Sequence, residues 1–309
     1  MRKILLLIPL FSISLLCNAQ YKWDVGGKLG CSNYLGDIGG GTGTRRNFVP
    51  DMKMPETRFA GGLFVRYRVH PKVSVQGGFD YVHIEGKDAL TPNLNRKYRN
   101  LTFYNNIFEV NVLAQYYFYE INDLGHTYRY RNDFKAYLGL GAAGFYHDPH
   151  ALDGTDLYPL HTELNTYSHF GFAIPYQIGF YFTVNKRYRI GWDLTMRQTF
   201  TDYLDDVSGN YPTSKEYIKS GGTQYNYDHY VDPTTQLNIS QAWKNNYGDP
   251  HSHSEAPNKR GQSNHTDSYL SSTINFSYAL RGKSTFYKST YGSIFKGKKY
   301  KKRKFRAKF

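Results

Sequence analysis

Large apolar side chains alternate with small or polar ones along eight separate stretches of the chain. In the clearest stretch, 108–118, apolar and aromatic residues at the even positions alternate with mostly polar ones, among them Glu109, Asn111 and Gln115. The other stretches are 22–36, 59–69, 73–81, 134–146, 170–182, 190–199 and 271–280. Because successive side chains of a strand point to opposite faces of a sheet, this period of two predicts eight β-strands.

The make-up of the two faces favours a barrel that spans a membrane. The alternative, a soluble barrel or sandwich, buries its apolar face and needs large side chains to fill a core. Here the polar positions are rich in Gly, Ser, Thr and charges of both signs, as in the interior of a closed membrane barrel. The 30 Tyr and 20 Phe fit the same interpretation.

The connections between the stretches alternate in length. Short ones lie at 70–72, 122–133 and 185–189, and long ones at 37–57, 85–105, 147–168 and 203–266. This is the arrangement of periplasmic turns and extracellular loops. We therefore predict an all-β fold, an eight-stranded antiparallel transmembrane β-barrel in the outer membrane, with long extracellular loops and both termini in the periplasm.

Charged residues of both signs recur on the face assigned to the lumen. An eight-stranded barrel is narrow, and side chains fill its interior. We expect opposite charges to pair there and plug the barrel, which argues against a diffusion porin. The candidate lumen charge network comprises Asp24, Lys28, Arg66, Arg68, Asp80, Glu109, Lys135, Asp193 and Arg197.

The chain begins with "MRKILLLIPLFSISLLCNAQ", a basic start followed by an apolar run and by small residues at Cys17 and Ala19. This pattern predicts a secretory signal peptide, 1–19, and the run is too short for a membrane-spanning helix. A lipoprotein attached through Cys17 is the alternative, and the bulky Leu16 argues against it. The mature sequence then keeps one cysteine, Cys31, which rules out an internal disulfide. Residues 20–280 are assigned to the barrel.

The last segment, 281–309, holds 12 Lys or Arg and no Asp or Glu, whereas basic and acidic residues balance in 20–280. Such a run repels itself and is expected to be disordered alone. In the periplasm it meets no nucleic acid, so it is either a solvated extension that can attach loosely to anionic lipid headgroups or a segment that docks on an acidic protein surface. The interleaved aromatic residues favour the protein. The candidate partner-binding residues are Lys298, Lys299, Tyr300, Lys301, Lys302, Arg303, Lys304, Phe305, Arg306 and Lys308.

Two motifs suggest ligand binding without completing a site. The glycine-rich "GDIGGGTGTRR" at 36–46 lacks the Lys-Ser/Thr ending of a phosphate-binding loop. The motif "HSHSE" offers His251, His253 and Glu255, but no further fixed ligand that zinc would need. A flexible outer loop explains the glycine-rich motif better than phosphate binding does, and polar-loop composition explains "HSHSE" as well as a metal site does.

Two further groups of residues leave chemistry open. A calcium ion could use the acidic residues of "TDYLDD", but the rest of an oxygen-donor loop is missing; they are Asp202, Asp205 and Asp206. A rim enzyme site could use His147, Asp148, His150 and His161. No nucleophile and base can be selected among them, because geometry must come first. We therefore predict no catalytic, cofactor-binding or metal-binding residues.

Several longer stretches resemble one family. They are "GGKLGCSNYLGDIGG", "FYHDPHALDGTDLYPLHTE", "AIPYQIGFYFTVNKRYRIGWDLTMRQTFTDYLDDVSGNY" and "NKRGQSNHTDSYLSSTINFSY". Together they look like the PorG-like outer-membrane barrels of Bacteroidota, which are associated with type IX secretion and gliding. The resemblance implies a non-enzymatic barrel attached to the periplasmic ring of the secretion machinery. It brings no catalytic residues and no cofactor.

Three functional hypotheses follow. The first is a structural or anchoring component of type IX secretion that uses the periplasmic turns and tail. The second is a surface-binding barrel that acts through its long extracellular loops, above all 203–266. The third, a small membrane-barrel enzyme, has the least support from the sequence.

Overall fold

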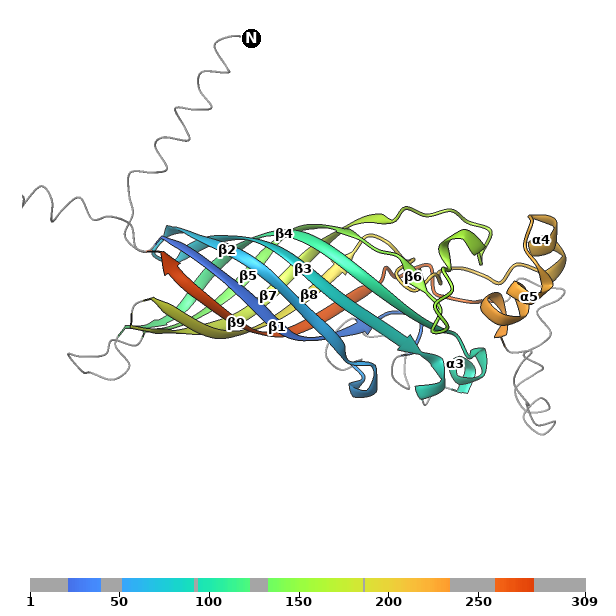
Figure 1. The fold of residues 1–309 in the computed structure, drawn as a ribbon, viewed down its shortest axis with the longest axis horizontal. Helices are drawn as coiled ribbons and strands as arrows, with labels where there is room; N and C mark the ends of the chain where they lie inside the picture. The colour runs from blue at the N-terminus through green and yellow to red at the C-terminus, as the bar shows by residue number, and fades with distance from the viewer. Residues whose placement is uncertain are drawn as a thin grey trace, which may run out of the picture.

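Eight antiparallel strands close into a barrel in the computed structural model, which describes residues 22–39, 52–91, 94–122, 133–185, 187–233 and 259–280 (Figure 1). The strands are β1 (Trp23–Leu35), β2 (Arg58–His70), β3 (Val73–Lys87), β4 (Thr102–Ile121), β5 (Asp133–Tyr146), β7 (Phe170–Val184), β8 (Tyr188–Thr199) and β9 (Ser268–Leu280). Their order around the ring is β3-β2-β1-β9-β8-β7-β5-β4, and pairing of β3 with β4 closes it. The prediction of an all-β fold with an eight-stranded antiparallel barrel is confirmed, and the side of the membrane that the loops and termini face stays a prediction.

Several predictions fall outside the part of the chain that the structure describes. These are the signal peptide 1–19, the basic tail 281–309, the "HSHSE" motif and most of the turn 122–133. They remain predictions.

The outer surface of the barrel is apolar because the alternating residues of each strand point away from the lumen. Leu63, Phe172 and Ile274, from three different strands, are 69%, 72% and 65% exposed. Lumen-facing residues of the same strands, such as Arg66 and Asn275, are buried. No helix in the described ranges is long and apolar enough to cross a membrane.

The two ends of the barrel differ. The short β2–β3 and β7–β8 connections lie at one end, where β1 also begins and β9 ends (Figure 1). The other end carries the longer loops with α3 (Leu94–Arg99), α4 (Ser214–Lys219) and α5 (Gln224–Asn226) (Figure 1). Short turns of helix there are η2 (Met54–Glu56), η3 (Asp88–Leu90), η4 (Tyr158–Leu160) and the π-helical η5 (Tyr227–Val231). We call this loop-bearing end the cap.

Near the cap the inward-facing side chains of the strands are apolar, whereas in the rest of the barrel they are mostly polar. The β3–β4 ladder continues to the pair Lys87–Thr102, well beyond the predicted strand end at 81. In this extension the inward residues Val82, Ile84, Phe103 and Ile107 are apolar and buried. They join a hydrophobic core with Tyr34, Ile38, Leu101, Phe145, Leu157, Leu204, Val207 and Tyr269. The cap is therefore built like a soluble domain, while the rest of the barrel keeps polar groups inside.

Candidate functional site

Ion pairs cross the lumen directly. Arg197 on β8 places its Nε 2.6 Å from Glu109 Oε2 on β4 and a terminal nitrogen 3.0 Å from Asp80 Oδ2 on β3. Lys28 Nζ lies 2.8 Å from the same Asp80 oxygen, and Tyr269 Oη donates to Glu109 Oε2 at 2.6 Å. Since β3 and β8 stand four places apart in a ring of eight, the Arg197–Asp80 contact spans the barrel.

A second set of buried charges lies nearer the end with short turns. Asp24 contacts Arg189 and, at 3.8 Å, Arg66. The Arg66 guanidinium lies over the rings of Tyr137 and Tyr181, 5.3 and 5.0 Å from their centroids. Cation–π contacts of this kind stabilise a charge that has left water. Together these groups occupy the lumen between the Arg197 cluster and the end with the short turns.

The nine candidate lumen residues all lie on the interior face, and they do not form one network. Lys28, Asp80, Glu109 and Arg197 make one cluster, and Asp24 with Arg66 belongs to the second. The other three bind residues outside the candidate set. Arg68 donates to Tyr181 Oη at 3.2 Å, Lys135 pairs with Glu120, and Asp193 accepts from Tyr137 and Asn275.

Sequence reasoning missed several partners. Arg189 fell in the segment assigned to a turn, and Tyr137, Tyr181 and Tyr269 were not singled out because tyrosine occurs on both faces. Glycines on the lumen face could have helped to locate the buried carboxylates. A Cβ atom at Gly62 would collide with Asp80 Oδ1, and one at Gly179 with Asp193 Oδ1. These glycines leave room for the buried carboxylates.

Two arginines, the partly buried Arg99 and the buried Arg260, tie the cap loops together. Arg99, at the end of α3, binds Asp88 Oδ2 at 2.7 Å and the carbonyl oxygen of Asp37 at 2.7 Å. Arg260 donates to Thr162 Oγ1 at 2.9 Å, Glu163 Oε1 at 3.1 Å and the Asp206 carbonyl at 2.6 Å. The four loops at this end, β1–β2, β3–β4, β5–β7 and β8–β9, thus meet around two guanidinium groups.

Two of the three aspartates considered as calcium ligands, Asp205 and Asp206, instead accept hydrogen bonds that hold cap loops together. Asp205 Oδ2 accepts from the backbone N–H of Ile38 at 3.1 Å, and Asp206 Oδ1 accepts from Tyr167 Oη at 2.9 Å. Burial raises the pKa of Asp206 to about 7, although Arg260 opposes the shift. Burial also raises the pKa of Glu56, in η2, to about 7.

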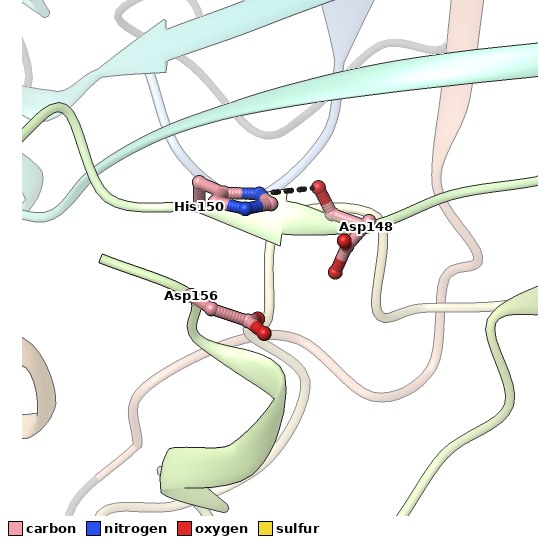
Figure 2. A group of neighbouring side chains, drawn as sticks. All are labelled: Asp148, His150 and Asp156. Carbon is pink, nitrogen blue, oxygen red and sulfur yellow. Dashed lines mark hydrogen bonds between the residues drawn. The ribbon is translucent and has the colours of Figure 1, made fainter. Parts of the chain in front are cut away.

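The histidines considered for a site at the barrel rim lie in different environments. His147 is buried, with Nε2 2.9 Å from the carbonyl oxygen of Ser168, and burial lowers its pKa to about 4. His161 lies beyond η4 in a left-handed backbone conformation, with φ 45°. His150, by contrast, stands beside Asp148 and Asp156 (Figure 2). One potential ligand atom from each of these three residues lies within 4.8 Å of the other two.

Residues 2–246 match a family described as a domain of unknown function, DUF6089. No curated protein matches the sequence. Among solved structures, the outer membrane protein OprG of Pseudomonas aeruginosa is similar, with 10% identity, coverage of 85% of this chain and 98% of that chain, and a TM-score of 0.35.

Ail, the attachment invasion locus protein of Yersinia pestis, is also similar in its complex with the heparin analogue sucrose octasulfate. It shows 9% identity, coverage of 83% of this chain and 98% of that chain, and a TM-score of 0.33. The resemblance to PorG-like barrels stays a prediction. Since the family match spans most of the sequence, the chain belongs to the DUF6089 family.

Proposed function

We propose that the protein is a non-enzymatic integral outer-membrane barrel that anchors the type IX secretion machinery through contact with its periplasmic ring. The observation that carries the membrane part is the contrast between an apolar exterior and buried ion pairs inside. Placing Leu63, Phe172 and Ile274 in water would expose apolar side chains from strands all round the barrel. Outer-membrane lipid is the partner that this surface fits.

The filled lumen supports a role at the ends of the barrel. Contacts such as Arg197–Asp80 join opposite walls, so side chains occupy the path that a diffusing solute would take. A protein of this design holds a position in the membrane and offers its turns, tail or cap to partners. The resemblance in "TFTDYLDDVSGNY" and the other motifs favours the secretion machinery as the partner.

The experiment is co-purification of ring proteins from detergent-solubilised membranes. One variant lacks 297–309, and a second changes Tyr300 and Phe305 to Ala. The matched control changes Phe286 and Tyr287 to Ala, which removes two aromatic rings upstream of the candidate segment. Docking predicts that all three variants insert, but that only the first two lose the ring proteins. Association that survives the deletion at physiological salt would show that the tail is not the tether.

A second candidate function, surface binding through the cap, is favoured by a pocket between the cap loops. Its volume is about 270 Å³, and its lining includes Leu101, Asp153, Tyr230 and Arg260. Tyr230 Oη donates to Asp153 Oδ2 at 2.6 Å and so fixes one wall. Adhesion of expressing cells to matrix-coated plastic, lost in Tyr230→Ala, would support this function. Equal adhesion of both strains would count against it.

A further inference from the structure

A tight hairpin at the cap side of the barrel carries Asp148, His150 and Asp156 (Figure 2). Its first arm includes β6 (Pro149–His150), which pairs with Tyr104 and Asn105 of β4. Its second arm returns so that Asp156 forms a backbone bridge with His150. Further backbone bonds, from Leu157 N to Pro149 O at 3.1 Å and from Ala151 N to Thr155 O at 2.8 Å, close the hairpin. The backbone therefore holds the three residues together.

The imidazole of His150 is oriented for ligation. Its Nδ1 lies 2.8 Å from the carbonyl oxygen of Asp148, shown as the dashed line in Figure 2. A carbonyl can only accept, so Nδ1 carries the proton and Nε2 keeps a free lone pair. The ring is also stacked on Tyr104, with centroids 5.4 Å apart and planes 20° apart. Metal-ligating histidines are commonly held by such a bond from the second nitrogen.

The two carboxylates are also held in place, and each keeps an acceptor site. The N–H of Asp148 donates to Asn105 Oδ1 at 2.9 Å, which fixes the backbone at this residue. Its carboxylate oxygen Oδ1 is buried and accepts no hydrogen bond from any residue within the described ranges. The neighbouring His169 Nδ1 is 3.8 Å away and lies 3.0 Å from the His147 carbonyl instead. Asp156 Oδ1 accepts from Tyr158 N at 3.0 Å.

The donor set selects the class of cation. Imidazole nitrogen with two carboxylates suits Zn²⁺ and similar divalent transition metals, whereas Ca²⁺ and Mg²⁺ prefer oxygen ligands alone. Bonds of about 2.1 Å put neighbouring ligands of a tetrahedral ion about 3.4 Å apart. The ligand atoms lie within 4.8 Å of one another, so binding of an ion requires them to move closer together. Three protein ligands leave a fourth position open.

We propose that Asp148, His150 and Asp156 form a binding site for a divalent transition-metal ion of the zinc class at the cap end of the barrel. A bound ion neutralises the two facing carboxylates and cross-links the two arms of the hairpin. All three residues are partly exposed, so water or a ligand atom from another molecule can complete the coordination. The site is independent of the anchoring role proposed above.

The test is a calorimetric titration of the full-length, untagged barrel with ZnCl2 after treatment with a chelator. We expect one equivalent to bind at this site, with affinity at least tenfold lower in His150→Gln and in Asp156→Asn. Calcium or magnesium chloride in hundredfold excess should not displace the zinc. Substitution with Co²⁺ should give the visible absorption of a four-coordinate nitrogen–oxygen site in the wild type and lose it in both variants.

Two controls make the outcome decisive. His229→Gln should leave zinc binding unchanged, although His229 is exposed and its Nδ1 likewise lies 2.9 Å from a backbone carbonyl, that of Tyr225. Changing His251 and His253 to Gln removes the other histidine motif. Heat-dependent migration in gels verifies that each variant is a folded barrel. The proposal is overturned if folded wild type binds no zinc, or if binding disappears with His251 and His253 but survives His150→Gln.

Discussion

Arg197 shows how single residues close this barrel. It is almost completely buried, and its guanidinium contacts both Glu109 and Asp80, while Lys28 adds a second positive charge beside Asp80. Removing charges from water costs several kcal/mol per ion unless partners replace the hydration. The cluster holds two positive and two negative side chains, so its charges balance.

We expect Arg197→Met to lower the free energy of unfolding by about 3–5 kcal/mol, because Glu109 is left buried without its cation. The double variant Arg197→Met, Glu109→Gln should recover part of this loss, since Asp80 keeps Lys28 and the second carboxylate is gone. Urea titration of the folded barrel in lipid vesicles measures both. A double variant as unstable as the single one would mean that packing, and not charge, dominates.

Ala114 tests the opposite face of the wall. It lies on β4 between Val75 of β3 and Leu140 of β5, with its side chain on the exterior. If this position is near the middle of the membrane, Ala114→Arg should lower stability by about 2–4 kcal/mol. Ala114→Leu, which keeps the surface apolar, is the matched control. A harmless arginine in lipid vesicles would contradict the assignment of this face to lipid.

At the scale of elements, alternation predicts the strands well and the cap poorly. A period of two is a local property, so the eight strands could be read directly from residues such as those at 108–118. The outer part of β3 could not, because Val82 and Ile84 continue the alternation with the faces exchanged. What they contact depends on loops that are remote in sequence, such as the one carrying Leu204 and Val207.

The site residues follow the same division. Alternation places Asn111 in the lumen on the same face as Glu109 of the same strand, to which it donates at 2.6 Å, but its hydrogen bond to Asp80 at 2.8 Å depends on the register of β3 against β4. Asp148, His150 and Asp156 come together only because the chain turns back between His150 and Asp156, and no pattern in the sequence predicted this turn. Residue spacing alone did not separate these three from their histidine neighbours.

Glu56 gives the cap a measurable response to pH. Its folded-state pKa of about 7 lies above the ordinary 4.5, because burial penalises the charged carboxylate. The folded state thus binds more protons between these values, and Glu56 lowers stability as pH rises from about 4.5 to 7. Glu56→Gln should therefore stabilise the cap by about 1–3 kcal/mol at pH 8.

The difference between wild type and Glu56→Gln should vanish at pH 4. His147, whose folded pKa of about 4 is below its ordinary 6.5, produces the opposite slope. It is present in both proteins and cancels in their comparison. Hydrogen exchange of the β3–β4 extension reports the opening of the cap. A difference that is constant across pH would show that the carboxylate does not titrate in this window.

At the scale of the whole molecule, the barrel separates two faces that would meet different partners. The first strand, β1, begins and the last strand, β9, ends at the side of the barrel with the short turns, and the cap occupies the opposite side (Figure 1). An even number of strands requires this arrangement. If the cap faces the outside of the cell, the basic segment 281–309 is in the periplasm, where the proposed ring partner lies.

Trypsin added to intact cells tests that orientation. Lys215 and Lys219 on α4 are exposed, and Gly221 just beyond them has a φ of 105° in the turn to α5. Lys259 is exposed too, but its backbone bridges to Asn210, so cleavage there requires local opening. We expect cuts first at α4, and changing Lys215 and Lys219 to Gln should remove them. The basic tail should stay intact until the outer membrane is permeabilised, because the protease cannot reach the periplasm. Cleavage of the tail in intact cells would show that the assigned orientation is wrong. The tail would then not face the periplasm, and the basis for its contact with a periplasmic ring would be removed.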